Sequence, residues 1–233
     1  DFCLSRGLGD VYKRQLLDLV EHIEPYCELI QNNTDGIIVK LKDYEHDFDV
    51  LDDVVYEWEQ RTGMKMDFDT YIGTIYQKDV NNYLLIDRKT GAVKAKGGYV
   101  MKLNDLSYDL PIINKALVDY MIHGIPVRRT IMECQDLREF QLVSRISSKY
   151  THILYGDKPI KEKCIRVFAS NNPADPGVKK VHAVRKTTAK LTNSPEHCFI
   201  FNDDVKGVPV PDKLDRQWYI DFANKRLSDF GVM

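Results

Sequence analysis

Residues 26–39 read YCELIQNNTDGIIV, a polar stretch between two apolar runs. The runs at 27–30 and 37–41 have the length of short strands, and the Asn-Asn-Thr-Asp-Gly sequence at 32–36 favours a tight turn between them. We therefore expect a β-hairpin with the carboxylate of Asp35 at its tip. An alternative stays open from the residues alone, in which Asp35 and Gly36 serve only to form the turn.

The segments on either side of this hairpin have helical spacing. Apolar residues at 16, 19, 20 and 23 predict a short helix that Pro25 ends. Residues 49–62 are amphipathic, and Gly63 follows them as a helix terminator. We expect this second helix to cover the hairpin with a face that carries Val50, Val54, Val55 and Trp58.

Farther along the chain, the pattern changes from strands to helices and back. Strands are expected at 71–76, 82–86 and 92–102, with a turn at Thr90 and Gly91. Helices are expected from Pro111 through Ile122 and at 135–147. From residue 150 onward, short strands and basic loops are broken by prolines, before a last helix near 216–230. The sequence thus predicts an α+β fold with a boundary near residues 102–110.

The formal charge of -2 hides a strong asymmetry. Residues 43–59 contain eight acidic residues and no Lys or Arg. Residues 158–190 contain nine Lys or Arg against only Glu162 and Asp175. The basic segment could follow a polyanion such as nucleic acid, and the alternative is a solvated surface without a ligand.

Cysteine spacing, apolar content and known motifs narrow the function class. The five cysteines are widely spaced without a C-x-x-C pair, which supports neither a disulfide framework nor a zinc site. No apolar run has the roughly 18 residues of a membrane span, so we expect a cytoplasmic protein with no membrane partner. Motifs such as H-E-x-x-H, G-x-S-x-G and G-x-x-x-x-G-K-[ST] are not found in the sequence.

The first fifteen residues, DFCLSRGLGDVYKRQ, have no clear period and do not read as the start of a domain. They resemble a translated adapter sequence that recurs at the ends of reading frames from environmental DNA. We therefore expect residues 1–15 to be non-native, with a genuine N-terminal arm as the alternative.

The stretch at 26–39 resembles the second carboxylate motif of the family B DNA polymerases. In that motif two apolar strands flank a turn of the form Asp-Thr-Asp-Ser at the catalytic edge of the palm. The resemblance assigns Asp35 to the second, metal-binding aspartate of the turn. Asn33 stands where the family usually has the first aspartate, Thr34 matches, and Gly36 replaces the serine.

A second resemblance follows downstream in a fitting order. Residues 94–99, KAKGGY, are similar to a Lys-x-Lys-Gly-x-Tyr element of viral branches of the family, with Gly97 in place of a commoner lysine. It implies phosphate contacts by Lys94 and Lys96 and packing near the duplex by Tyr99. The segment from Leu106 to Gly231 resembles the thumb. Further duplex contacts are expected in this segment at Arg138, Lys149, Lys179, Lys180, Arg185 and Lys186.

The resemblance implies the C-terminal part of a viral or phage-type DNA-directed DNA polymerase, whose intact form uses Mg²⁺, primer-template DNA and deoxynucleoside triphosphates. Its expected parts are the end of the palm over 16–105, an antiparallel sheet with packed helices, and a mixed, mainly helical thumb over 106–233. We expect this piece alone to be inactive, because the upstream part of the polymerase is missing from it. A phage enzyme would work in the cytoplasm of a bacterial host. The alternatives are a non-catalytic nucleic-acid-binding protein and a structural domain with neither property.

Overall fold

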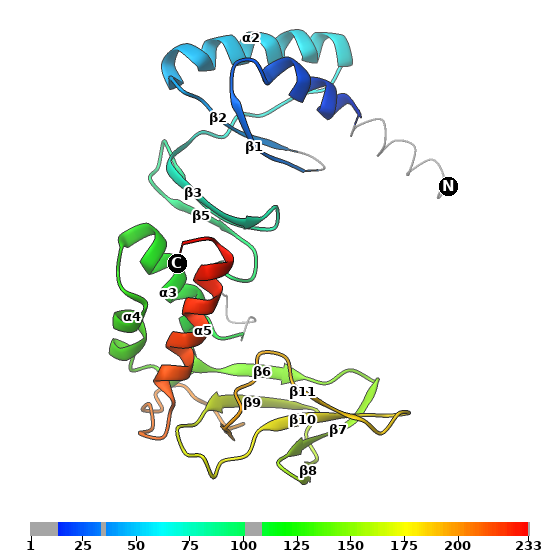
Figure 1. Ribbon diagram of the computed structural model, residues 1–233, viewed down its shortest axis with the longest axis vertical. Helices are drawn as coiled ribbons and strands as arrows, with labels where there is room; N and C mark the ends of the chain where they lie inside the picture. Colours follow the sequence, from blue (N-terminus) through cyan, green and yellow to red (C-terminus); the bar gives the residue numbers. More distant parts are fainter. Residues whose placement is uncertain (1–13, 34–35, 101–108, 233) are drawn as a thin grey trace. The chain divides into compact units, whose positions relative to one another are not determined.

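The computed structural model describes residues 14–33, 36–100 and 109–232 (Figure 1). The chain divides into two compact units. Unit 1 comprises Asp1–Ile72 and Asp87–Ala92, and unit 2 comprises Gly73–Ile86 and Val93–Met233. The predicted boundary between residues 105 and 106 lies outside the described residues and stays a prediction, as does the foreign origin of the N-terminal segment. None of the described helices is both long and apolar enough to cross a bilayer.

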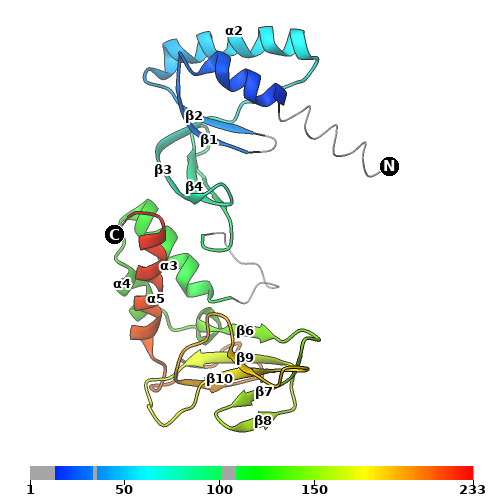
Figure 2. The same cartoon turned by 45° about the vertical axis from the view of Figure 1, so that its right-hand side comes forward.

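Unit 1 contains the expected hairpin and its covering helix (Figure 2). A helix over residues 14–23 leads into strands β1 (Glu28–Asn32) and β2 (Ile37–Lys40), and α2 (Tyr44–Thr62) follows. The two helices bury one cluster of apolar side chains, against which Ile37 and Val39 of the hairpin pack. The cluster consists of Leu16, Leu19, Ile23, Leu51, Val55 and Trp58.

Helix α2 begins five residues earlier than the sequence predicts. The side chain of Asp43 accepts a hydrogen bond from the Glu45 N–H (3.2 Å), which caps the first turn. The expected end at Gly63 is confirmed, with φ 71° and an N–H that donates to the Glu59 carbonyl. On the inner face Val50 and Val54 are only half-buried, and Leu51 joins Val55 and Trp58 in the core instead.

A three-stranded sheet contains β3 (Tyr71–Asp79), β4 (Asn82–Asp87) and β5 (Val93–Lys96) in that order. Strands β4 and β5 are antiparallel, with Tyr83 opposite Lys96. The third strand was expected to continue to residue 102, but it ends at Lys96. The reason is Gly97, whose φ of 95° is incompatible with an extended strand.

Unit 2 contains three α-helices: α3 (Pro111–His123), α4 (Val127–Glu133) and α5 (Arg216–Asp229). Helices α3 and α5 confirm the sequence prediction, including the end of α3 at Gly124. The short helix α4 was not predicted. The predicted helix at 135–147 is wrong, because this segment forms a 3₁₀ helix, η1 (Leu137–Phe140), and then strand β6 (Leu142–Arg145). Leu142 and Ile146 are both buried, and their spacing of four fits a helix equally well.

The rest of unit 2 forms two antiparallel sheets, with strand orders β12-β9-β6 and β11-β10-β7-β8. The α+β class is therefore confirmed. The described part of residues 106–233 is mixed as expected, but it is not mainly helical, because it holds seven strands beside three α-helices. The strands after β6 are β7 (Tyr150–Tyr155), β8 (Lys158–Ile160), β9 (Cys164–Ala169), β10 (Val178–His182), β11 (Thr188–Lys190) and β12 (Cys198–Ile200).

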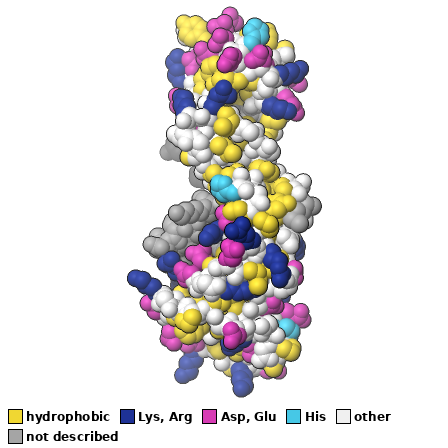
Figure 3. Space-filling view, turned by 90° about the vertical axis from the view of Figure 1, so that its left-hand side faces the viewer, with side chains coloured by type: hydrophobic (Ala, Val, Ile, Leu, Met, Phe, Trp, Pro, Cys, Tyr) yellow, Lys and Arg dark blue, Asp and Glu magenta, His cyan; other side chains and the backbone are white. Residues whose placement is uncertain are grey.

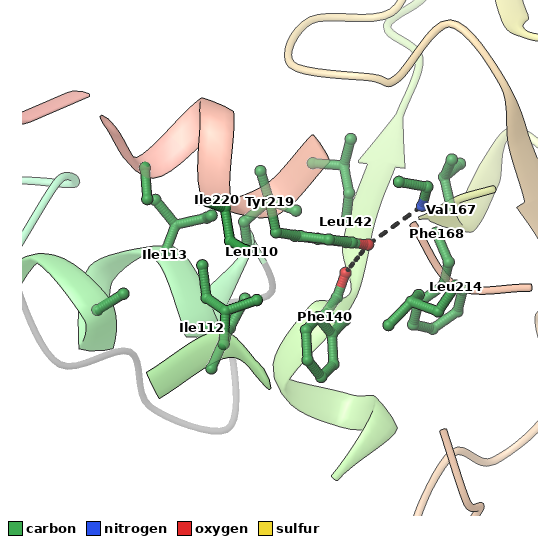
Figure 4. Close-up of a cluster of buried hydrophobic side chains, with 14 of the residues drawn as sticks. Leu110, Ile112, Ile113, Phe140, Leu142, Val167, Phe168, Leu214, Tyr219 and Ile220 are labelled. Atoms are coloured by element: carbon green, nitrogen blue, oxygen red, sulfur yellow. Dashed lines mark hydrogen bonds between the residues drawn. The ribbon is translucent and has the colours of Figure 1, made fainter. Parts of the chain in front are cut away.

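Tyr219 joins the helices of unit 2 to its strands (Figure 4). Its side chain is fully buried, and its hydroxyl donates to the Phe140 carbonyl (2.8 Å) and accepts from the Ala169 N–H (3.1 Å). Burial raises the pKa of this phenol, so it stays a neutral donor. Beside it, the rings of Trp218 and Phe222 stack with centroids 5.1 Å apart. Trp218 and Phe222 are partly buried against the same core, so all three aromatic residues serve packing.

The cysteines of unit 2 should differ sharply in reactivity. Cys198 is buried, its Sγ donates to the Pro176 carbonyl (3.3 Å), and burial raises its pKa to about 12. Cys164 is exposed. In a Cys3→Ser background at pH 8, we expect a disulfide reagent to label Cys164 first and Cys198 only after unfolding, because the thiolate is the reactive form. Loss of the fast phase in Cys164→Ser is the control, and rapid native labelling of Cys198 would contradict the burial.

Candidate nucleic-acid interface

The hairpin that the sequence assigns to metal chemistry has the expected connection. Asn32 lies opposite Ile37, and the Asn33 N–H donates to the Gly36 carbonyl (2.9 Å). Thr34 and Asp35, which follow Asn33 in the sequence, lie outside the described residues, so the role of Asp35 stays a prediction.

Two buried amide oxygens on β1 have no hydrogen-bond donor among the described residues. They are Gln31 Oε1 and Asn32 Oδ1. Oxygen atoms are the ligands that Mg²⁺ takes. These two oxygens do not by themselves form a metal site, and no group of three or more His, Cys, Asp or Glu that could hold a metal ion occurs among the described residues.

The lysines of β5 lie on a mostly exposed edge strand. Lys94 and Lys96 are exposed and share one face of the strand by alternation. The ammonium of Lys96 lies 5.6 Å from the ring centroid of Tyr83 on the neighbouring strand. The strand expected at 92–102 would have continued this face, but β5 ends at Lys96.

Gly97 is fixed by a close approach of two backbone segments. A Cβ atom at this position would overlap the Asn81 carbonyl oxygen and the Asn82 side chain in the β3–β4 turn. That turn is itself held by Asp79, which accepts from the Asn82 amide (2.9 Å) and the Asn81 N–H (2.9 Å). Hydrogen bonds from Lys78, then Asn82 and Asn81, lower the pKa of Asp79 to about 2. The departure from lysine at position 97 therefore has a steric cause in this fold.

Tyr99 connects the segment after β5 to helix α5. Its half-buried ring lies between the Lys78 ammonium (5.1 Å to the centroid) and the Arg226 guanidinium (4.6 Å), and it packs edge-on against Phe230. These contacts give Tyr99 a structural role within unit 2. Its expected position near a duplex stays a prediction.

A buried polar pair, Arg226 and Asn114, supports the segment after β5, and sequence reasoning did not identify it. Arg226 is 5% exposed, and its guanidinium donates to Asn114 Oδ1 (3.1 Å), while the Asn114 amide donates to the Gly98 carbonyl (2.9 Å). Burial lowers the pKa of Arg226, and Asp109, Tyr99 and Asp229 oppose that shift. The spacing of Arg226 within the last helix gives no signal that it is buried, so the sequence could not identify it.

Four of the expected DNA contacts lie in one hairpin, and a fifth, Lys149, lies beside it. We define the basic hairpin as residues 178–190, which comprise β10, β11 and the loop 183–187. The adjacent end of β7 joins it, because the Lys149 carbonyl accepts from the Ala183 N–H (2.8 Å). Arg138 lies on η1 instead, 3.6 Å from the Asp136 carboxylate. The basic hairpin and Lys149 together bring six cations into one region: Lys149, Lys179, Lys180, Arg185, Lys186 and Lys190.

The basic side chains of this region form no ion pair with a carboxylate among the described residues. On the face drawn in Figure 3, basic and acidic side chains are interspersed, as on an ordinary solvated surface. Residues 176–195, in contrast, contain no Asp or Glu, and the ion pairs among the described residues involve none of the six cations. Lys179 and Lys190 even lie directly opposite each other on paired strands, an arrangement that destabilises a sheet.

No protein-family model matches this chain, and no curated protein matches it.

Proposed function

We propose that this chain holds DNA by its phosphates, as the C-terminal part of a viral-type family B DNA polymerase. The observation that carries the DNA-binding part is the direct opposition of Lys179 and Lys190 in a hairpin without acidic residues. Like charges placed opposite each other cost stability, and a polyanion bound across them removes that cost. The hairpin has no element that reads base edges, which suits an enzyme that must hold any sequence.

The polymerase part of the proposal rests on the hairpin at 28–40. Its strands pair on either side of the Asn-Thr-Asp-Gly sequence at 33–36, where the resembled motif has its metal-binding carboxylate. In the intact enzyme Asp35 supplies one carboxylate to Mg²⁺, and a further segment of the polymerase supplies another. The substrates are then primer-template DNA and deoxynucleoside triphosphates, and the compartment is the cytoplasm.

The second candidate is a non-catalytic nucleic-acid-binding protein. It is favoured by the same basic hairpin, which needs no carboxylate or metal to hold phosphates. The two candidates share DNA binding by this chain and differ only in the role of Asp35.

A salt titration of DNA binding tests the shared part. We expect the full chain to bind a DNA duplex at low salt, with an affinity that falls as salt rises. The double variant Lys179→Gln, Lys190→Gln should lower the slope of log K against log salt by about 2, since each phosphate contact contributes about 0.9. It should also melt no lower than the parent protein, because the repulsion between these two lysines is removed.

The matched control removes the same charge elsewhere in unit 2. Lys115 on α3 and Lys225 on α5 are both exposed, and the variant Lys115→Gln, Lys225→Gln should leave the slope nearly unchanged. Equal losses from the two double variants would mean that binding depends on total charge, and would rule out the basic hairpin as the site. If the full chain binds no DNA even at low salt, the proposed function is wrong.

A further inference from the structure

The tip of the basic hairpin is held in one conformation by a histidine ring. His182 Nδ1 accepts hydrogen bonds from the N–H groups of both Val184 and Arg185 (3.2 Å each). Below the tip, the His182 carbonyl accepts from the Lys186 N–H (3.1 Å), and its N–H donates to the Thr187 carbonyl (2.9 Å). The loop is therefore a built turn, in which Lys186 takes a left-handed φ of 56°.

The base of the tip is packed as well. The ring of His182 meets the ring of Tyr150 on β7 with centroids 5.8 Å apart, and the Lys180 ammonium lies 4.5 Å from the centroid of Tyr150. These contacts anchor His182 to a neighbouring strand. The residues at the tip are consequently presented on a firm support.

Val184 at this tip is exposed to an unusual degree. Its side chain is 83% exposed, the largest value among the exposed large apolar side chains of the described residues. A lone exposed apolar residue needs no explanation by itself. Here, however, Val184 lies in a turn that hydrogen bonds hold in place, and Arg185 and Lys186 follow it directly. An exposed apolar side chain therefore stands next to two cations that could contact phosphates.

We propose that Val184 is a wedge that inserts between stacked bases of bound DNA while Arg185 and Lys186 contact the flanking phosphates. This inference rests on the proposed function and adds a local distortion of the duplex to it. Proteins that kink DNA use apolar side chains of this kind between base steps, supported by cations on the backbone. The Lys179–Lys190 pair, five residues below the tip, lies about 15 Å farther along the hairpin at an extended rise, close enough to hold the same duplex.

The charge and the shape of the hairpin favour nucleic acid over a membrane surface. A membrane-binding tip buries several apolar residues in the lipid interface, whereas the loop 183–187 offers only Val184 and the small Ala183. The cations also continue down β10 and β11 to Lys179 and Lys190, which suits an extended polyanion. The test must therefore distinguish binding to DNA from binding to anionic lipid.

The test uses the full chain and a duplex that contains 2-aminopurine, whose fluorescence rises when it is unstacked. At saturating protein we expect the parent chain to raise the fluorescence and Val184→Ser to lose most of that rise. The affinity should fall by only about fivefold, because one buried valine is lost while the phosphate contacts remain. His182→Phe keeps a ring against Tyr150 but removes the acceptor of the tip, and it should lose the rise as well.

Met132→Ser is the control, because Met132 is an exposed apolar side chain (43%) on α4, and it should leave both the fluorescence and the affinity unchanged. Salt-dependent binding with no fluorescence rise, or a rise that Val184→Ser keeps, would overturn the wedge and leave the proposed function intact. Loss of binding to phosphatidylserine vesicles in Val184→Ser, with DNA binding unaltered, would assign the tip to lipid instead. If the parent chain binds no duplex at low salt, the proposed function fails together with the wedge.

Discussion

In the intact polymerase to which we propose that this chain belongs, primer extension should fall about a thousandfold or more when Asp35 is replaced by Ala. A carboxylate that ligates a catalytic metal supplies several kcal/mol of transition-state stabilisation, and each 1.36 kcal/mol corresponds to a factor of ten in rate. DNA binding should change little, because the basic hairpin that we propose to hold the phosphates does not include Asp35. The measurement is single-turnover extension of a primed template by the gene product that contains this segment, in the presence of Mg²⁺.

The control for this loss is Asp52→Ala. Asp52 lies on the exposed face of α2 in the same unit as the hairpin, so its removal changes the charge equally without touching the loop. Asp52→Ala should extend primers at the parent rate. Full activity of Asp35→Ala would leave Asp35 as a turn residue and favour the non-catalytic DNA-binding candidate. The isolated chain should extend no primer in any case, and extension by it would contradict the need for a second carboxylate from elsewhere.

The sequence predicts most reliably those elements whose signals are local. The hairpin around residues 32–36, the end of α2 at Gly63 and the helix that starts at Pro111 each carry their own turn or capping residues. The failure at 135–147 has a physical cause, since Leu142 and Ile146 fit both periods and the pairing of β6 with β9 decides between them. That pairing joins residues 19 to 25 positions apart, so no signal within the segment itself indicates it.

The features of the candidate site also differ in whether the local sequence predicts them. Charge is additive along the chain, so the basic composition of 158–190 is enough to indicate the region of the basic hairpin. The opposition of Lys179 and Lys190 depends on the register of two strands, and the support of the Val184 tip depends on the ring of His182. Both of these features are tertiary, and the sequence predicts neither.

Gly97 gives the second large expected effect, and it concerns stability. Replacing Gly97 with Ala should lower the free energy of unfolding by about 3 kcal/mol or more, because a left-handed φ and a steric overlap add to each other. The overlap involves the Asn81 carbonyl, which is backbone and cannot rotate away as a side chain could. Hydrogen exchange of the peptides that cover β3, β4 and β5 measures the effect in the place where it arises.

Substitutions at Gly91 and Gly98 distinguish the effect of the positive φ from the effect of the steric overlap. Gly91 also has a positive φ (68°) but no atom within 4 Å of a Cβ, and Gly98 has open space without a positive φ. We therefore expect Gly91→Ala to cost about 1 kcal/mol and Gly98→Ala to stay within about 0.5 kcal/mol. Gly97→Lys, which restores the residue more common in the resembled motif, should unfold this sheet rather than strengthen DNA binding. A stable Gly97→Lys protein with tighter DNA binding would show that the β3–β4 turn can move aside, and the steric explanation of the departure would then be wrong.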